Sequence, residues 1–221
     1  MAGEIDGPRL APKTGPARAL VVFVHGYGAD GNDLIEIGRA WQKLLPQAAF
    51  VSPHAPRPCG QAPMGREWFP LTFRNPDERW DGVNMAAPGL AQFLDAALAR
   101  HEVPPSRLAL VGFSQGTMMA LHVGLRRAKP LAGIVGFSGM LAGPDVLKAE
   151  IKSRPPVLLT HGDKDEMLPH ILSHRAAQVL QENDVKVGLH IAEGIGHGIN
   201  DTGLSAAARF LLESFKLPMP Q

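Results

Sequence analysis

Cysteine is nearly absent from this sequence. Cys59 is the only one among 221 residues, so the chain can form no disulfide within itself. Proteins of oxidising compartments often depend on disulfides, whereas free thiols are usual inside the cell. We therefore expect a cytoplasmic location. The sequence leaves open whether the Cys59 thiol is exposed or buried.

Long hydrophobic runs are absent as well. No apolar segment approaches the roughly 20 residues that a helix needs to cross a bilayer, so we expect no integral membrane association. Residues 1–18 contain Glu4, Asp6 and several prolines, and they lack the apolar core of a signal peptide. We expect this segment to be an extended N-terminal arm or an edge strand.

Neither sign of charge is in excess. The 22 Lys and Arg residues balance 21 Asp and Glu residues, and the formal net charge is +1. Nucleic-acid-binding proteins usually carry a marked positive excess, so we expect no nucleic-acid partner. Hydrophobic residues make up 45% of the chain and charged residues 19%, which suits one α/β domain over residues 1–221.

What the sequence does contain is a series of short, almost wholly apolar runs. Such runs are typical of parallel strands covered on both faces. The candidate strands are residues 19–24, 49–52, 108–112, 133–137, 157–160 and 186–191.

Amphipathic helical repeats alternate with these runs. They are marked by residues 34–45, 90–98, 117–126, 171–180 and 204–215. Alternation of this kind predicts a doubly wound, mostly parallel sheet with helices on both faces.

Residues 53–82 interrupt this alternation. The segment is rich in proline, has no clean periodicity and contains the aromatic residues Trp68, Phe69, Phe73 and Trp80. It is interpreted either as a self-packed surface loop or as the wall of an acyl-binding groove, because apolar pockets are often lined by aromatics. Exposed apolar surface in this segment would be compatible with a homodimer.

The sequence Gly112-Phe113-Ser114-Gln115-Gly116 lies between a candidate strand and a candidate helix. A serine with glycines two residues away on either side, on a strand-to-helix turn, is the nucleophile elbow of α/β hydrolases. The turn is so tight that larger flanking side chains would collide. Ser114 is therefore the candidate nucleophile.

An elbow serine also needs donors for the negative charge that develops on a substrate carbonyl. The backbone amide of Gln115 is one candidate, because it follows the nucleophile. The amide of Tyr27 is the other, in the glycine-rich segment after the strand at residues 19–24. The alternative interpretation of that segment is a plain glycine-rich turn.

A serine nucleophile needs an imidazole base, which in turn needs a carboxylate. His197 lies between glycines in a loop before the last helix and is the candidate base. His161 is interpreted as a structural hydrogen-bonding residue and His190 as a strand residue. No histidines have convincing metal-ligand spacing, and we expect no metal.

Two carboxylates compete for the role of acid. Asp163 and Asp165 both follow the strand at residues 157–160. Asp163 is nearer the strand and could cap the turn, whereas Asp165 has the better reach to the last loop. The residues alone leave both possible.

Six motifs occur in an order that resembles the carboxylesterase / acyl-protein thioesterase (lysophospholipase-like) family of small α/β hydrolases, from about residue 20 to residue 215. They are His25-Gly26-Tyr27-Gly28, Ser52-Pro53-His54-Ala55-Pro56, Trp68-Phe69, Gly112-Phe113-Ser114-Gln115-Gly116, His161-Gly162-Asp163-Lys164-Asp165 and Gly196-His197.

The resemblance implies an α/β-hydrolase fold without a large lid domain and without a cofactor. It places the nucleophile on Ser114, the acid on Asp165 and the base on His197, with the amides of Tyr27 and Gln115 as oxyanion donors. Members of the family cleave carboxylic esters, lysophospholipids or, in some eukaryotes, thioester-linked fatty acids on proteins.

The chain departs from the family pattern at a few positions. Thr117 replaces a glycine that many members have, Met140 replaces a tryptophan of the eukaryotic thioesterases, and Glu166-Met167 replaces a Pro-Leu pair. The last two departures alter the expected acyl channel. We predict that Trp68, Met140 and Met167 line the acyl groove.

We therefore expect a serine carboxylesterase that acts on small ester or lipid-like substrates with short to medium acyl chains. The alternative is a lysophospholipase or acyl-protein thioesterase that acts on longer chains. More remote alternatives are a catalytically silent binding module and the same fold with other chemistry, such as a peptidase or a cofactor-free haloperoxidase.

Overall fold

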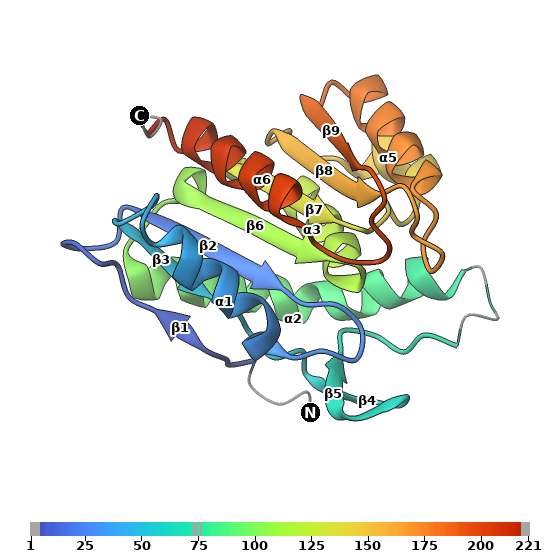
Figure 1. Cartoon of the computed structure of the whole chain (residues 1–221), viewed down its shortest axis with the longest axis horizontal. Helices are drawn as coiled ribbons and strands as arrows, with labels where there is room; N and C mark the ends of the chain where they lie inside the picture. The colour runs from blue at the N-terminus through green and yellow to red at the C-terminus, as the bar shows by residue number, and fades with distance from the viewer. Residues whose placement is uncertain (1–4, 73–74, 76, 218–221) are drawn as a thin grey trace.

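A 7-stranded sheet runs through the middle of the molecule (Figure 1). The structure is a computed structural model that describes residues 5–72, 75 and 77–217. Across the sheet the strands follow the order β1 (Arg9–Leu10), β3 (Ala48–Val51), β2 (Ala19–Val24), β6 (Leu108–Phe113), β7 (Gly133–Phe137), β8 (Val157–Gly162) and β9 (Val187–Ala192). Among these seven strands, only β1 is antiparallel to its neighbour. The predicted mostly parallel sheet is confirmed, and the edge strand β1 lies within the N-terminal segment.

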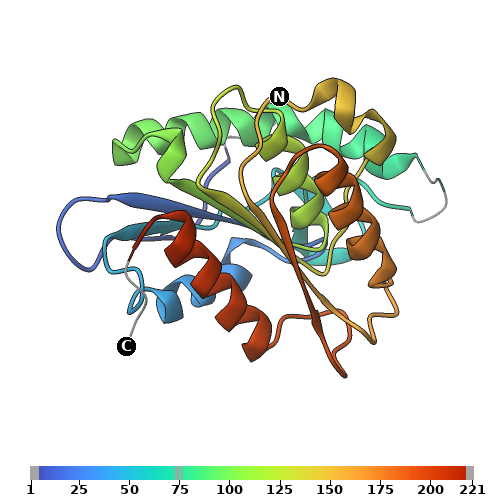
Figure 2. The ribbon, with the colours of Figure 1, turned by 90° about the horizontal axis from the view of Figure 1, so that it is seen from above.

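Helices cover both faces of this sheet, as the sequence predicts. One face carries α1 (Gly31–Trp41) and α6 (Asp201–Ser214), and the other carries α2 (Glu78–His101), α3 (Gln115–Leu125) and α5 (Ile171–Glu182) (Figure 2). The short elements are η1 (Pro105–Arg107), η2 (Pro144–Val146) and α4 (Leu147–Glu150). Among the described residues, no helix is both long enough and apolar enough to cross a membrane.

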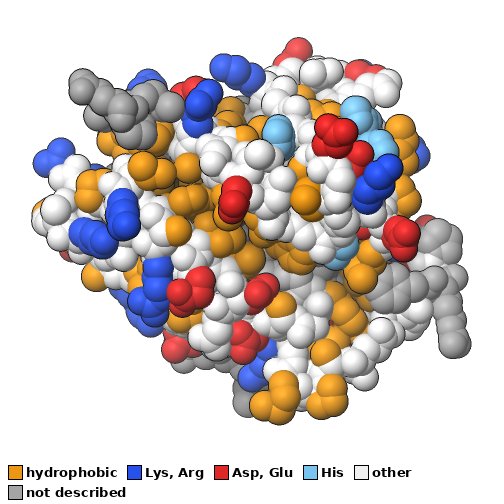
Figure 3. Space-filling model, in the orientation of Figure 1, with side chains coloured by type: hydrophobic (Ala, Val, Ile, Leu, Met, Phe, Trp, Pro, Cys, Tyr) orange, Lys and Arg blue, Asp and Glu red, His pale blue; other side chains and the backbone are white. Residues whose placement is uncertain are grey.

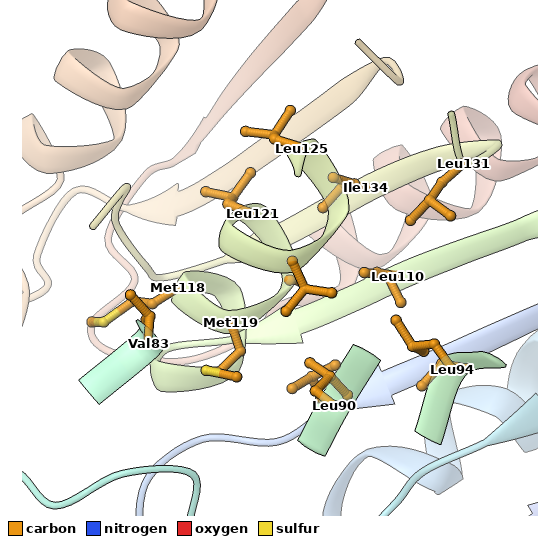
Figure 4. Packing of buried hydrophobic residues seen from close by; sticks show 14 of the residues in the cluster. Val83, Leu90, Leu94, Leu110, Met118, Met119, Leu121, Leu125, Leu131 and Ile134 are labelled. Atoms are coloured by element: carbon orange, nitrogen blue, oxygen red, sulfur yellow. The ribbon is translucent and has the colours of Figure 1, made fainter. Parts of the chain in front are cut away.

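The strands are apolar throughout because each contributes side chains to two hydrophobic cores. In β2, Leu20 and Val22 belong to one core and Val21 and Phe23 to the other, as the alternation of side chains along a strand requires. Figure 4 shows the first core, where Leu90 and Leu94 of α2 meet residues of α3, β6 and β7. This packing makes the sheet a rigid base for the loops at its edge.

The irregular segment contains structure that its sequence does not predict. Strands β4 (Arg57–Cys59) and β5 (Ala62–Glu67) form a two-stranded antiparallel hairpin. Helix α2 then begins at Glu78, well before its apolar repeat, and has Pro88 inside it. A proline normally marks a helix boundary, which is why periodicity alone places the start too late. Phe73 lies outside the described residues.

The carboxyl ends of the parallel strands meet at one edge of the sheet. Their register pairs Val24 with Gly112 and Phe113 with Phe137, so the loops that follow β2, β6 and β7 start side by side. In Figure 1 the arrowheads of β2, β6 and β8, which mark the carboxyl ends of these strands, point to the right. In the same orientation, the histidine side chains visible on the surface also lie on the right half of the molecule (Figure 3). Ligands of open α/β sheets bind at this edge.

Candidate active site

Ser114 occupies a strained position between β6 and α3. Its backbone has φ 52° and ψ −115°, which is unusual for a residue with a side chain. Its amide donates to the Phe137 carbonyl oxygen at 2.9 Å. Serine at the N-cap of a helix usually caps it, but the Ser114 hydroxyl makes no such bond. Backbone strain of this kind is typical of functional sites and leaves the hydroxyl available for another role.

The two flanking glycines are required by the tight packing of the turn. A Cβ on Gly112 would lie 2.5 Å from the Gly116 carbonyl oxygen, and a Cβ on Gly116 would lie 1.8 Å from that of Val24. Thr117, the family departure, fits because Gly136 and Gly139 leave room for its methyl group, and its hydroxyl donates to the Phe137 carbonyl oxygen at 2.9 Å. The chain therefore turns sharply at Ser114, directly beside the end of β2.

Asp165 and His197 come together although they lie on different loops. His197 Nδ1 is 2.7 Å from Asp165 Oδ2. The other carboxylate oxygen, Oδ1, accepts from the amides of Met167 at 3.0 Å and Leu168 at 2.8 Å. Burial by itself raises the pKa of Asp165, but the Leu168 amide and the His197 ring outweigh it and hold this pKa below its ordinary value. Asp165 is thus an ionised partner for the imidazole.

Asp163, the competing carboxylate, has a different contact. Its Oδ1 accepts from the Gly194 amide at 2.6 Å, in the loop that carries His197. The Lys164 amide also donates to the Ile195 carbonyl oxygen at 2.9 Å. Asp163 therefore ties the acidic loop to the His197 loop and does not contact the imidazole.

His197 lies next to the elbow. Its ring centroid is 5.1 Å from that of Phe113, the residue before Ser114. The Ser138 hydroxyl donates to the Gly198 carbonyl oxygen at 3.1 Å and so ties the His197 loop to the end of β7. Among the described residues, no hydrogen bond joins the Ser114 hydroxyl to His197. Bonds of this kind are often long in a free enzyme and tighten when substrate binds.

The glycine-rich segment after β2 lies directly against the elbow. A Cβ on Gly26 would lie 3.4 Å from Ser114 Cβ, so Tyr27 follows a point of close approach. His25 connects the glycine-rich segment to the loop after β3, because its Nε2 accepts a hydrogen bond from the Ala55 amide at 2.9 Å. Burial lowers the pKa of His25 to about 4 and keeps the ring neutral. The β5 strand adds a second support, since the Gly28 amide donates to the Arg66 carbonyl oxygen at 2.9 Å.

Gln115 contributes its side chain as well as its amide. The amide is the first of α3, where N–H groups have no partner within the helix. The buried side chain accepts from the Trp68 amide at 2.9 Å and donates to the Phe69 carbonyl oxygen at 2.8 Å. No local sequence pattern predicts this role, because Trp68 and Phe69 are distant from Gln115 along the chain.

The predicted groove residues lie in three different environments. Trp68 is 1% exposed, and its indole N–H donates to the His25 carbonyl oxygen at 3.0 Å. Met140 is partly buried and packs against the first core. Met167 is 63% exposed, and its backbone is bound to Asp165.

A cavity of about 530 Å³ opens between α2 and the β1 edge of the sheet. Trp68 lines it together with Arg9, Val51, Phe93 and Arg100, but neither Ser114 nor His197 does. Trp68 therefore contacts both this cavity and His25, in the glycine-rich segment that lies against the elbow. Among residues 5–72, 75 and 77–217, no group of three or more His, Cys, Asp or Glu side chains is placed to hold a metal ion.

The fold and the elbow define an α/β hydrolase. The chain belongs to the phospholipase/carboxylesterase family, whose family model matches residues 6–214. This membership makes the protein a hydrolase of the esterase and thioesterase class. No large lid domain is present in the part of the chain that the structure describes.

Named relatives and solved structures agree with this assignment. The chain is 30% identical to acyl-protein thioesterase 1 of Schizosaccharomyces pombe, over 87% of this chain and 89% of that protein. It is 28% identical to esterase YpfH of Escherichia coli, over 93% and 85%. The crystal structure of esterase PE8 matches with a TM-score of 0.93 and 45% identity, covering 96% of this chain and 99% of that one.

Proposed function

We propose that the protein is a serine carboxylesterase in which Ser114 is the nucleophile, His197 the general base and Asp165 the acid. The observation that carries the proposal is the 2.7 Å contact between His197 Nδ1 and Asp165 Oδ2. The His197 ring also packs against Phe113, the residue before Ser114 in the elbow. We propose small ester or lipid-like molecules with short to medium acyl chains as substrates.

The proposed mechanism begins with the tautomer of His197. Because Nδ1 donates its hydrogen to Asp165, Nε2 carries the lone pair that can accept a proton. Ser114 Oγ attacks the ester carbonyl carbon while its proton passes to His197 Nε2. The amides of Tyr27 and Gln115 stabilise the oxyanion. The alcohol leaves with that proton, and water then releases the acid from the acyl-enzyme in the same way.

This mechanism requires His197 to be neutral in the free enzyme. A proton on His197 would remove the lone pair that accepts the serine proton, so we expect kcat/KM to fall as the pH drops below neutrality. A profile that stayed flat down to pH 5 would contradict the assignment of His197 as the base.

We also propose that Trp68, Met140 and Met167 line the acyl groove. Met167 is the most useful of them to test, because its exposed side chain can be truncated without loss of core packing. For Met167→Ala we expect a changed preference among acyl chain lengths, with the rate on acetate esters unchanged. Equal effects on all chain lengths would remove Met167 from the groove.

A second candidate function is hydrolysis of longer acyl groups from thioesters. It is favoured by the 30% identity to a protein named acyl-protein thioesterase 1. A comparison of palmitoyl thioester with palmitoyl oxygen ester at equal concentration distinguishes the two functions. A marked preference for the thioester would support this second candidate over the first.

Covalent labelling tests the nucleophile directly. A fluorophosphonate reacts with an activated serine, whose oxygen forms a bond to phosphorus as fluoride leaves. We expect a single adduct, located on Ser114 by peptide mass mapping, and no adduct on Ser114→Ala. An adduct on another residue, or none on folded protein, would contradict the proposal.

A further inference from the structure

Asp165 has a second imidazole partner, which the proposed mechanism does not use. His161 Nε2 lies 3.0 Å from Asp165 Oδ2, the same oxygen that His197 Nδ1 contacts at 2.7 Å. The side chains of His161 and Asp165 are both fully buried. The carboxylate therefore lies between two imidazole rings, one inside the protein and one beside the elbow.

The surroundings of His161 decide where its hydrogen lies. Nε2 faces two acceptors, Asp165 Oδ2 and the Leu168 carbonyl oxygen at 2.7 Å. A nitrogen that faces only acceptors carries a hydrogen. Nδ1 lies 2.7 Å from the Ser173 hydroxyl, which can donate to it. Burial lowers the pKa of His161, in agreement with a neutral ring that has its hydrogen on Nε2.

The His161 ring is fixed from several elements. It belongs to the end of β8, and its partner Ser173 lies in the first turn of α5. The Ser173 hydroxyl has a single hydrogen, so when it donates to His161 Nδ1 at 2.7 Å it does not donate to the Gly139 carbonyl oxygen, which lies farther away at 3.2 Å in the loop after β7. The ring thus connects the Asp165 loop to a buried part of α5.

We propose that His161 is a positioning residue for Asp165. Its Nε2–H holds Oδ2 in the orientation that His197 needs and takes up part of the carboxylate charge. This inference rests on the proposed roles of Asp165 and His197. The titratable groups that face one another here are Asp165, His161 and His197, and Asp163 lies on the adjoining turn, bound to Gly194.

Substitution of His161 separates this role from simple packing. His161→Leu removes the N–H donor, whereas His161→Gln keeps an N–H that can reach Oδ2. For His161→Leu we expect kcat to fall about 10- to 100-fold with little change in KM, as for loss of one hydrogen bond to a charged group. We expect His161→Gln to recover a large part of that loss.

The pH profile provides a readout that packing would not change. Without the His161 donor, the full charge of Asp165 acts on His197 and favours its protonated form. We therefore expect the acid limb of kcat/KM in His161→Leu to move to higher pH by about 0.5 to 1 unit. His122→Leu is the matched control, because His122 is a buried histidine that packs against Trp80 and does not contact Asp165. It should leave kcat and the limb unchanged.

A measurement on the wild-type protein does not depend on catalysis. In long-range ¹H–¹⁵N spectra of histidine-labelled protein, we expect the hydrogen on Nε2 of His161 and on Nδ1 of His197. A hydrogen on Nδ1 of His161, or wild-type kcat and pH profile in folded His161→Leu, would overturn the proposal. If the wild type hydrolyses no ester, the proposed function fails, while these spectra still decide the His161–Asp165 contact. They also decide it if His161→Leu does not fold.

Discussion

At the scale of single residues, the site depends on how a fully buried carboxylate stays ionised. Burial raises the pKa of Asp165, and the N–H groups of Leu168, His197 and His161 bring it below its ordinary value. Both oxygens are occupied, Oδ1 by backbone amides and Oδ2 by imidazoles. A buried charge with this many donors is stable and has a fixed orientation.

The two neighbouring aspartates provide a matched pair of variants. Asp165→Asn changes the hydrogen-bonding partner of His197 and favours the wrong tautomer, so we expect kcat to fall about 10³- to 10⁴-fold. Asp163→Asn keeps an oxygen that can accept from Gly194, so we expect kcat within about threefold of wild type. Steady-state ester hydrolysis measures both. Equal losses in the two variants would contradict the assignment of Asp165.

Local spacing was enough to predict some of these residues and not others. Glycines on either side mark the turns that carry Ser114 and His197, so local spacing predicts both residues. Asp163 and Asp165 share one loop, so spacing leaves both possible. The family resemblance favours Asp165, and Asp165 is the carboxylate that contacts His197. The Gln115 side chain bonds to the backbone of Trp68 and Phe69, which are distant from it in sequence. No pattern in the sequence predicts such a contact.

At the scale of elements, the strand-to-helix turn is the part that tolerates least change. The first residues of α3 pack directly on the end of β2, and backbone atoms make the contact. Backbone cannot move aside as a flexible side chain can. The glycine-rich segment, the elbow and the loop after β7 therefore hold one another in place.

Gly116→Ala tests this packing. Its Cβ would lie 1.8 Å from the Val24 carbonyl oxygen, so we expect a loss of roughly 1 to 3 kcal/mol in the free energy of unfolding, together with most of the activity. Gly60→Ala is the control, because nothing lies within 4 Å of its Cβ. Urea denaturation and ester hydrolysis measure the two effects. Wild-type stability in Gly116→Ala would show that the contact is not tight.

The elements differed in how well their sequences predict them. The central strands are buried on both faces, so their apolar runs give bounds within a few residues; residues 19–24 and 133–137 agree fully with β2 and β7. The β4–β5 hairpin is largely exposed, with Met64 92% exposed, and lacks an alternating pattern. A strand shows a recognisable hydrophobic pattern because its side chains are buried, and an exposed hairpin buries few side chains.

At the scale of the whole molecule, buried neutral histidines make stability depend on pH. Burial lowers the pKa of both His25 and His122 from 6.5 to about 4. Between these values the unfolded chain binds protons that the folded chain does not. Stability contributed by these groups is therefore present above pH 6.5 and is lost as the pH falls toward 4.

We predict a loss of about 2 kcal/mol per histidine between pH 7.5 and pH 5, measured by urea denaturation. His122→Leu should weaken this dependence by removing one of the two contributions. Asp165 affects the pH dependence of stability only at lower pH, because its pKa in the folded protein lies below its ordinary value. We propose that the chain is one domain, so each transition should be single and cooperative. An unchanged pH dependence in His122→Leu would show that His122 does not contribute to it.

The most direct test of Ser114 as the nucleophile is hydrolysis of p-nitrophenyl esters from acetate to palmitate by wild type and by Ser114→Ala. We predict turnover by the wild type that Ser114→Ala loses almost completely, with the highest kcat/KM at a short or medium chain length. Equal turnover by the two proteins, or none by folded wild type on any ester, would contradict the assignment of Ser114 as the nucleophile of an esterase.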